Sequence, residues 1–574
     1  MTNFSSTILK SAKATQGALL IVTWVAFLLR TVNLAGQSLW RDEVDAIRFS
    51  SWSLSELLAG LFRVGHNGPV FFLLLRPWRS LTGDSEFALR YPAALLGTLA
   101  VPLGFALARQ LGFSRRVGLL LGLLLATSPY LVWYGQEAKM YALLLALVIL
   151  AFIAYLKALT IPSPTLRGFR GEQVGENLTL QPLKSGGEGG WGDEGGMRCP
   201  PLNLVGGGWW WVIFVVATSL SFYTHILAPL MLVVYGLVAL FHHADLRRHW
   251  RGWLISMGCL TVPYLPLVLW QAPLWLDGFQ SGHAFYPLEK QIFILLQLYS
   301  SGLVRFVGLT GLILFVFLFL CGLFLPGRPP THSALPLVAG QADTRRLATN
   351  YASRFSAQPP LGTFHTSRFI LAIWVLLPPF IVFLISLRVP VFEDRYLIYI
   401  VPGFYLLTVI GLILVRQYSS LLAGLCLGLL LTINLLGIWQ QQSQPIKADF
   451  RAATAYLASQ PHPPSPIMIQ MPYLQHTFDY YYRGDYTLLE GLWTNNGKTE
   501  ATVDAEMTAL TADLSELWLV VSEEESWDSR RLTRAWLDAH AELVDQAHFM
   551  RVDLYHYQFR PGAIETRSIG AGME

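Results

Sequence analysis

The sequence has few charged residues for its length. Asp, Glu, Lys and Arg make up only 14% of the 574 residues, whereas soluble domains average about 25%. Hydrophobic residues supply 53% of the chain, which is more than a single soluble core absorbs. The composition therefore excludes an ordinary soluble protein and indicates that most of the chain lies in lipid.

Cysteine is also scarce, and the 13 histidines include no His-x-x-x-His pair of the kind that binds zinc on a helix. The four cysteines are Cys199, Cys259, Cys321 and Cys426. No pair of them has the spacing of a metal site, so neither a disulfide framework nor a zinc site is expected. No basic stripe with interleaved aromatic residues is present, which excludes nucleic acid as a partner.

The charges that are present divide into two regions. Residues 441–574 contain 10 Lys+Arg and 19 Asp+Glu, a net charge of −9, and residues 1–440 carry +13. We predict an all-α polytopic membrane domain over 1–440 and a small, acidic α/β domain over 441–574. Within the second region, the patterns predict helices over 448–459 and 529–540 and strands over 466–471, 517–522 and 549–559.

Apolar segments long enough to cross a membrane recur throughout the first region. A spanning helix needs about 20 predominantly apolar residues, and we find about eleven candidates. Their limits are 17–34, 91–108, 117–133, 140–158, 208–223, 226–243, 252–270, 305–325, 368–387, 396–415 and 419–439. The region is therefore predicted to be a bundle of transmembrane helices that contacts membrane lipids.

The distribution of Lys and Arg predicts how the bundle is oriented. Most of these residues lie in loops that share one side if the N-terminus is cytoplasmic. An odd number of spans then places the acidic domain on the extracytoplasmic side, as expected for a bacterial-type plasma (inner) membrane protein. Two cytoplasmic loops, 162–208 and 327–366, are rich in small and polar residues, and we predict that they are disordered.

Polar residues gather in four clusters, all on the predicted outer side. Ionisable groups near a membrane indicate a functional site by default. The clusters are Asp42-Glu43, the string from Trp133 to Tyr141, Tyr223-Thr224-His225, and the segment from Glu393 to Tyr396. Each one alone has an ordinary structural explanation, such as a helix cap, an aromatic belt or a snorkelling Arg. Their shared side is what indicates a site.

The first outer loop is predicted to carry helices that lie along the membrane surface. Ser53-Leu54-Ser55-Glu56 has the pattern of a capping box at a helix start, and apolar residues recur behind it. A second helix is expected after His66-Asn67-Gly68-Pro69.

The order of these motifs resembles a known group of enzymes. A Trp-x-Asp-Glu follows the first span, then come Arg90-Tyr91-Pro92, Tyr-Gly-Gln-Glu-x-x-Met-Tyr, Tyr-Thr-His, and Asp-Arg-Tyr-Leu-x-x-x-x-Pro. The series resembles the GT-C fold glycosyltransferases that use polyprenyl-phosphate sugars. More narrowly, it is similar to the protein-mannosyltransferase-like and aminoarabinose-transferase-like members of family 39.

The resemblance implies an activity and a role for particular residues. It implies transfer of a sugar, with inversion, from a polyprenyl-phosphate-linked donor to a lipid, glycan or protein acceptor of the cell envelope. Asp42 would be the base or the carboxylate that orients the acceptor, with Glu43 in support. Arg395 would bind the donor phosphate, with Lys139 as a second phosphate-binding residue. The residues expected to line the cavity are His66, Tyr134, Gln136, Glu137, Tyr141, His225 and Tyr396.

Two alternatives stay open at this point. Members of the family differ in metal use, so the first alternative is that Asp42 and Glu43 bind a divalent metal. No other cofactor is expected. A polytopic lipid or oligosaccharide flippase or transporter would have a similar number of spans. Transporters, however, usually place their ionisable groups near the middle of the membrane. The enzyme hypothesis requires Asp42, Glu137 and Arg395 to border one external cavity, and it is weakened if they lie far apart.

Overall fold

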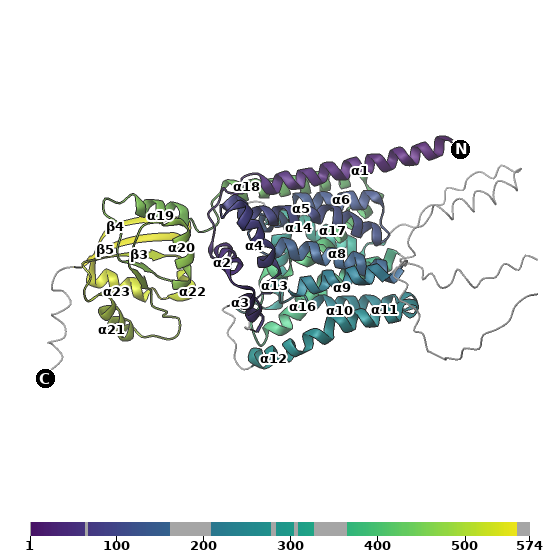
Figure 1. Ribbon diagram of the computed structural model, residues 1–574. Helices are drawn as coiled ribbons and strands as arrows, with labels where there is room; N and C mark the ends of the chain where they lie inside the picture. Colours follow the sequence, from purple (N-terminus) through teal and green to yellow (C-terminus); the bar gives the residue numbers. More distant parts are fainter. Residues whose placement is uncertain are drawn as a thin grey trace, which may run out of the picture.

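The computed structural model describes residues 2–62, 67–160, 208–276, 283–303, 308–326 and 364–559. It consists of a long helical bundle followed by a smaller sheet-containing domain at one end of that bundle (Figure 1). We call this end of the bundle the domain end. The predicted fold class, a polytopic helical protein with a small C-terminal α/β part, is confirmed.

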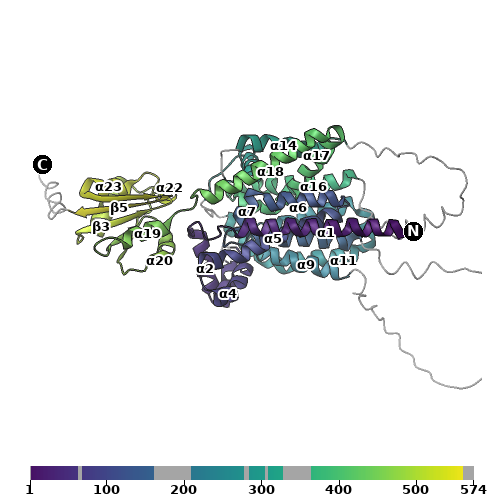
Figure 2. The ribbon, with the colours of Figure 1, turned by 90° about the horizontal axis from the view of Figure 1, so that it is seen from above.

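The bundle is built from helices that run mostly parallel to its long axis (Figures 1 and 2). They are α1 (Thr2–Thr31), α5 (Glu86–Gln110), α6 (Arg115–Thr127), α7 (Pro129–Gly135), α8 (Tyr141–Thr160), α9 (Trp209–Phe222), α10 (Leu230–Phe241), α11 (His243–Thr261), α12 (Leu265–Leu276), α13 (Leu288–Ser301), α14 (Gly308–Phe324), α16 (Phe364–Ser386), α17 (Val401–Tyr418) and α18 (Ser420–Ser443). The 3-10 helices η4 (Val262–Tyr264) and η5 (Asp394–Ile400) precede α12 and α17.

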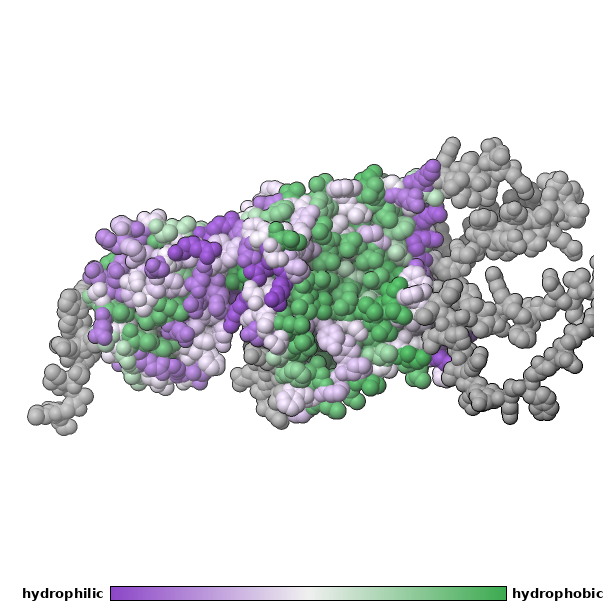
Figure 3. Space-filling model, viewed as in Figure 1, coloured by the Kyte–Doolittle hydropathy of each residue, from purple (hydrophilic) through white to green (hydrophobic). Residues whose placement is uncertain are grey.

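Seven helices among the described residues are long and apolar enough to cross a membrane, by length and composition. The pair α6 and α7, bent by 59°, would form an eighth span. The remaining predicted spans coincide with the shorter apolar helices α9, α10 and α14. A broad apolar belt covers the middle of the bundle, with hydrophilic residues at its two ends (Figure 3). Large apolar side chains of α1, such as Leu20, Ile21 and Trp24, are exposed, as lipid-facing residues should be.

The bend between α6 and α7 has a clear local cause. α6 ends at Thr127, and Pro129, two residues later, is the first residue of α7. Proline cannot donate the backbone hydrogen bond that would continue α6, but it is well tolerated at the first position of a new helix. Ser128 caps α7 by accepting a hydrogen bond from the Leu131 amide at 3.2 Å. The carbonyls of Leu125 and Ala126, which the break leaves without helical partners, accept hydrogen bonds from buried Arg30 at 2.9 and 3.2 Å. The bend aims α7 at the domain end.

Short helices form the domain end of the bundle: α2 (Arg41–Ser51), α3 (Leu54–Ala59), η1 (Gly60–Phe62) and α4 (Val70–Thr82). The predicted capping box at Ser53 and Glu56 is present. Gly68 brings the start of α4 against the loop between α9 and α10, because a Cβ there would lie 2.0 Å from the Tyr223 carbonyl oxygen. The Val70 amide donates to the same carbonyl at 3.2 Å. This contact places α4 beside the loop that carries His225.

The C-terminal domain is a five-stranded sheet with helices packed on it. The strand order is β2-β1-β3-β5-β4, parallel between β2, β1 and β3 and antiparallel between β3, β5 and β4. Its elements are α19 (Phe450–Ala458), β1 (Ile467–Ile469), η6 (Pro472–Leu474), α20 (Gln475–Tyr481), β2 (Leu488–Glu490), α21 (Glu500–Thr511), β3 (Glu516–Val521), α22 (Glu524–Trp527), α23 (Leu532–His540), β4 (Ala541–Phe549) and β5 (Val552–Phe559).

The sheet contains two strands that the sequence patterns did not predict. β2 is only three residues long, and β4 is an edge strand whose side chains are mostly exposed. Neither has the dense apolar pattern of β1, β3 and β5, and edge strands in general lack it. The predicted domain boundary at residue 441 falls near the end of α18. The two loops predicted to be disordered lie almost entirely outside the described residues.

Candidate active site

The centre of the candidate site is a carboxylate that faces a guanidinium. Asp42, at the start of α2, lies with its Oδ2 3.7 Å from Nη2 of Arg395, on η5. Asp42 is only 17% exposed. Burial alone would raise its pKa, but the positive charges of Lys139, Arg395 and Arg41 outweigh burial and lower it. Asp42 is therefore ionised at neutral pH and able to accept a proton or a hydrogen bond.

Tyrosines of α7 hold the segment that carries Arg395. Tyr134 donates its hydroxyl proton to Oδ2 of Asp394 at 2.9 Å, and Tyr130 donates to the Asp394 carbonyl at 3.0 Å. The guanidinium of Arg395 lies 5.4 Å from the Trp40 ring centre, within cation–π range. Its buried Nε has no hydrogen-bond acceptor among the described residues. Arg395 is thus fixed in place with donor capacity to spare.

Glu43 is committed to contacts within the protein. It is fully buried, and Arg90 binds both of its carboxylate oxygens at 2.7 Å. The Ala138 amide donates to Oε1 at 3.0 Å, and the Lys447 ammonium donates to Oε2 at 2.8 Å. Burial would raise the Glu43 pKa, but the two cations hold it well below its usual range. The geometry makes Glu43 an anchor for the start of α2, directly beside Asp42.

Glu137 shares the Lys447 ammonium but is less well satisfied. Its Oε1 lies 3.6 Å from Lys447 Nζ, and its buried Oε2 has no hydrogen-bond partner among the described residues. Burial raises the Glu137 pKa to about 7, although the charge of Lys447 opposes this shift. Glu137 is therefore a carboxyl group that titrates near neutral pH beside the site.

Aromatic rings connect the second, third and fourth clusters. The His225 ring lies between Tyr396, 4.7 Å away, and Tyr141, 6.3 Å away, measured between ring centres. The ring is fully buried, and its Nε2 has no partner among the described residues. Burial, followed by the charge of Arg395, lowers the His225 pKa to about 3. The histidine is accordingly neutral at physiological pH.

Lys139 borders a small hollow formed mainly by the short helices at the domain end. The hollow has a volume of about 190 Å³ and is lined by Phe49, Trp52, Leu57, Gly60, Asn67, Pro69, Phe72, Lys139 and Met140. Lys139 is 7% exposed, and its charge acts on both Asp42 and Asp45. A second cation therefore lies near Asp42, on the side of α2 and α4.

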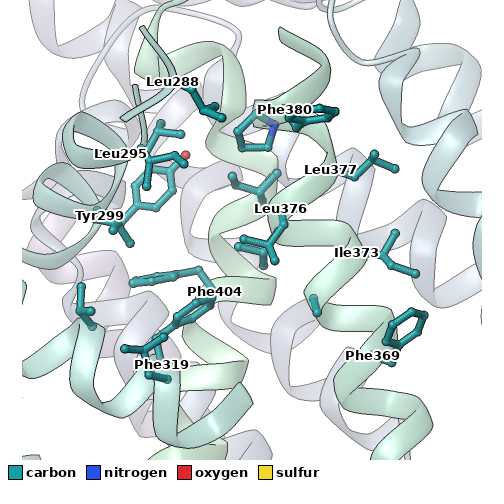
Figure 4. Close-up of a pocket in the computed structure, with 18 residues that line it drawn as sticks. Leu288, Leu295, Tyr299, Phe319, Phe369, Ile373, Leu376, Leu377, Phe380 and Phe404 are labelled. Atoms are coloured by element: carbon teal, nitrogen blue, oxygen red, sulfur yellow. The ribbon is translucent and has the colours of Figure 1, made fainter. Parts of the chain in front are cut away.

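A larger apolar cavity lies along the helices next to η5. Its volume is about 560 Å³, and side chains of α13, α14, α16 and α17 point into it, including Leu295, Leu376 and Phe404 (Figure 4). Two residues that line the cavity also contact or belong to η5, the helix that carries Arg395. Ile400 is the last residue of η5, and the Tyr299 hydroxyl donates to the Leu397 carbonyl at 3.1 Å. An apolar chain would fit such a cavity, whereas a polar substrate would not.

The structure brings most of the sequence-predicted site residues together. Asp42, Glu43, Lys139, Tyr134, Glu137, Tyr141, His225, Arg395 and Tyr396 form one connected group at the domain end. Gln136 lies beside this group, but its amide faces α1 and donates to the carbonyls of Arg30 and Val32 at 3.2 and 3.1 Å. His66 lies outside the described residues.

Sequence reasoning did not single out two cations of the group. Arg90 belongs to the Arg90-Tyr91-Pro92 motif, but no role was assigned to it. A charged residue at the start of a spanning helix does, however, indicate a candidate functional site. Lys447 comes from the connection between α18 and α19, and the sequence around it resembles the entry to the external domain without indicating a role in the site.

The carboxylates do not fit a metal site. All the acceptor positions of Glu43 described above point to Arg90, Lys447 and a backbone amide, and Asp42 is flanked by cations. Within the described residues, no group of three or more His, Cys, Asp or Glu side chains converges.

Comparisons with known proteins agree with the fold and the motifs. Residues 66–167 match the model of the dolichyl-phosphate-mannose-protein mannosyltransferase family. No curated protein matches the chain. Three similar solved structures are ArnT from Cupriavidus metallidurans in the apo state (TM-score 0.50, 15% identity, covering 95% of this chain and 98% of that one), the same enzyme bound to undecaprenyl phosphate (0.49, 16%, 94% and 98%), and the Archaeoglobus fulgidus oligosaccharyltransferase with Zn and sulfate (0.48, 12%, 90% and 69%).

The likeness to apo ArnT establishes the fold of this chain. The resemblance to GT-C glycosyltransferases that the motifs indicated is thereby confirmed at the level of the fold, and the protein is an integral membrane protein.

Proposed function

We propose that this protein is a membrane glycosyltransferase that moves a sugar from a polyprenyl-phosphate-linked donor to an acceptor hydroxyl at the domain end of the bundle. One observation carries the proposal: the ionised carboxylate of Asp42 faces the guanidinium of Arg395. Arg395 lies on η5, and Ile400, the last residue of η5, lines the apolar cavity. A base, an anion-binding group and a place for a lipid chain are thus adjacent.

The parts of such a donor suit the surfaces around Arg395. The lipid chain would occupy the apolar cavity beside α13 and α16, and the phosphate would bind Arg395, whose planar donors recognise phosphate oxygens well. Lys139 would supply a second positive charge. The aromatic hollow at Lys139 offers apolar walls with few polar groups, as small-ligand pockets usually do, and we place the sugar or the acceptor there.

The reaction would be a single displacement. Asp42 accepts the proton of the acceptor hydroxyl as the acceptor oxygen attacks the anomeric carbon. The bond between that carbon and the phosphate oxygen breaks, and the polyprenyl phosphate leaves with the electron pair. Arg395 stabilises the negative charge that develops on the phosphate. One displacement inverts the configuration at the anomeric carbon. A general acid is not needed, because a phosphate is already a good leaving group.

The family match supports this choice of donor. It covers the string from Tyr134 to Tyr141 and names enzymes whose donor is a sugar on a lipid phosphate. The distribution of Lys and Arg favours the outer face of a bacterial-type plasma membrane for the domain end.

The test is a transfer assay with the purified protein in proteoliposomes. Lipid extracts supply acceptors, and polyprenyl-phosphate sugars are added as donors, while mass spectrometry follows free polyprenyl phosphate and glycosylated products. We expect release of polyprenyl phosphate matched by a new glycosylated product, and neither with Asp42→Asn. Movement of intact lipid-linked sugar across the bilayer, without release of the lipid phosphate, would instead support a flippase.

A further inference from the structure

The C-terminal domain reaches into the candidate site through a single buried lysine. Lys447 lies between α18 and α19 and is 8% exposed. Its ammonium donates to Glu43 Oε2 at 2.8 Å, lies 3.6 Å from Glu137 Oε1, and sits 5.1 Å from the centre of the Trp133 ring. The connection to the sheet domain is therefore part of the charge cluster next to Asp42.

The backbone around Lys447 is also fixed. The amides of Ile446 and Lys447 both donate to Oε1 of Gln37 at 3.0 Å, and the Gln37 amide nitrogen donates to the Gln441 carbonyl at 2.7 Å. Gln37 belongs to the turn that leads from α1 to α2. A lysine held at both its backbone and its ammonium cannot relax without moving the start of α2.

The sheet domain contacts the other side of the same segment. Glu523 pairs with Arg41 at 2.9 Å, and Arg41 Nε lies 3.8 Å from Oδ1 of Asp42. The Tyr481 hydroxyl accepts a hydrogen bond from the Leu39 amide at 2.6 Å and also contacts Glu86. Asp42 thus stands on a short segment that the C-terminal part of the chain holds from both sides.

We propose that the C-terminal domain assembles the active site, with Lys447 as its main positioning residue and Glu523 as a second one. Lys447 fixes Glu43, Glu43 fixes the first turn of α2, and that turn sets the distance between Asp42 and Arg395. This inference rests on the proposed function. It adds that the sheet domain is required for turnover and is not only an accessory that binds acceptors.

The test compares full-length variants in the proteoliposome assay. Lys447→Met removes the charge and keeps the chain length, and we expect kcat to fall about 100-fold while KM for the donor stays within about threefold, because small displacements of a catalytic group act on turnover. Lys447→Arg, which keeps the charge, should recover most of kcat. The matched control is Lys498→Met, since Lys498 pairs with Glu506 inside the C-terminal domain, and it should behave as wild type.

A second variant covers the case in which Lys447→Met does not fold. Glu523→Gln changes a 25% exposed side chain, and we expect it to fold and to lower kcat about threefold to tenfold by releasing Arg41 beside Asp42. A wild-type kcat in folded Glu523→Gln, or in folded Lys447→Met, would overturn the inference. So would a raised acceptor KM with unchanged kcat, which would indicate acceptor binding by the domain. If the wild type itself does not transfer sugar, the proposed function fails instead.

Discussion

Arg395 Nη2 lies 3.7 Å from Asp42 Oδ2, a distance too long for a strong hydrogen bond. The two charges attract each other without using up the donors of the guanidinium or the lone pairs of the carboxylate. Asp42 is therefore ionised and free to accept a proton, while Arg395 can still bind an incoming phosphate. A fully hydrogen-bonded pair, such as Arg90 and Glu43, would have neither capacity. This difference assigns separate roles to the adjacent carboxylates.

The first prediction concerns Asp42 as the base. Asp42→Asn keeps the shape of the side chain but cannot accept the proton, so we expect turnover to fall by about 10²–10⁴-fold, measured as release of polyprenyl phosphate. Asp45→Asn is the matched control on the same helix and should keep most of the activity. Retained turnover in folded Asp42→Asn would remove Asp42 from this role.

Arg395 is expected to act on the donor. Arg395→Ala should weaken the use of the donor by about 2–4 kcal/mol, because a desolvated guanidinium–phosphate contact is lost. The measurement is kcat/KM with the donor varied at saturating acceptor. Arg388→Ala, at an exposed arginine nearby in the sequence, controls for the loss of a positive charge. Equal donor dependence in the two variants would show that Arg395 does not bind the phosphate.

The positioning of Arg395 by tyrosine hydroxyls can be tested separately. Tyr134→Phe removes the 2.9 Å hydrogen bond to Asp394, so η5 loses one of its two anchors on α7. We expect kcat to fall about tenfold, from imperfect orientation, in a protein that still folds. Tyr155→Phe removes a comparable buried hydrogen bond to the Tyr235 carbonyl, away from the site, and should leave kcat unchanged. A similar kcat in both variants would count against the positioning role.

The apolar cavity predicts a dependence on lipid length. Ala372, on α16, lines the cavity, and Ala372→Phe would fill part of it. We expect KM to rise for a long-chain polyprenyl donor and to stay constant for a donor with a short prenyl chain, which does not reach the added ring. The assay uses the same sugar on both lipids. A parallel rise for both donors would indicate general damage, and no rise for either would place the lipid elsewhere.

The larger features of the molecule could be predicted from the sequence because they depend on local patterns. The apolar segments and the capping box at Ser53 follow from composition and spacing. The four polar clusters could be placed on one side because the spans alternate in direction. Asp42 and Arg395 meet for that reason, although they lie far apart in the chain.

The separate roles of neighbouring residues within the clusters could not be predicted from local patterns. Asp42 and Glu43 are adjacent and chemically similar, and only the tertiary contacts with Arg90 and Lys447 distinguish them. Gln136 lies in the same string as Glu137, yet the turn after α7 points its amide at α1. Lys447 contacts Glu43 through a connection between domains, and no spacing rule relates residues so distant.

The raised pKa of Glu137 makes the stability of the folded protein depend on pH. The Glu137 pKa rises from an ordinary 4.5 to about 7 in the folded protein. Well below pH 4.5 the carboxyl is protonated in both folded and unfolded chains, so Glu137 does not make stability depend on pH there. Between pH 4.5 and 7 only the unfolded chain loses the proton, and the free energy of unfolding therefore falls as pH rises.

Glu137→Gln cannot ionise, so its stability relative to wild type should increase by about 3 kcal/mol from pH 4 to pH 8. Unfolding midpoints in detergent at several pH values measure this difference, with Glu490→Gln, at an exposed position of β2, as the control. Parallel pH curves for Glu137→Gln and wild type would show that Glu137 titrates as an ordinary exposed carboxyl.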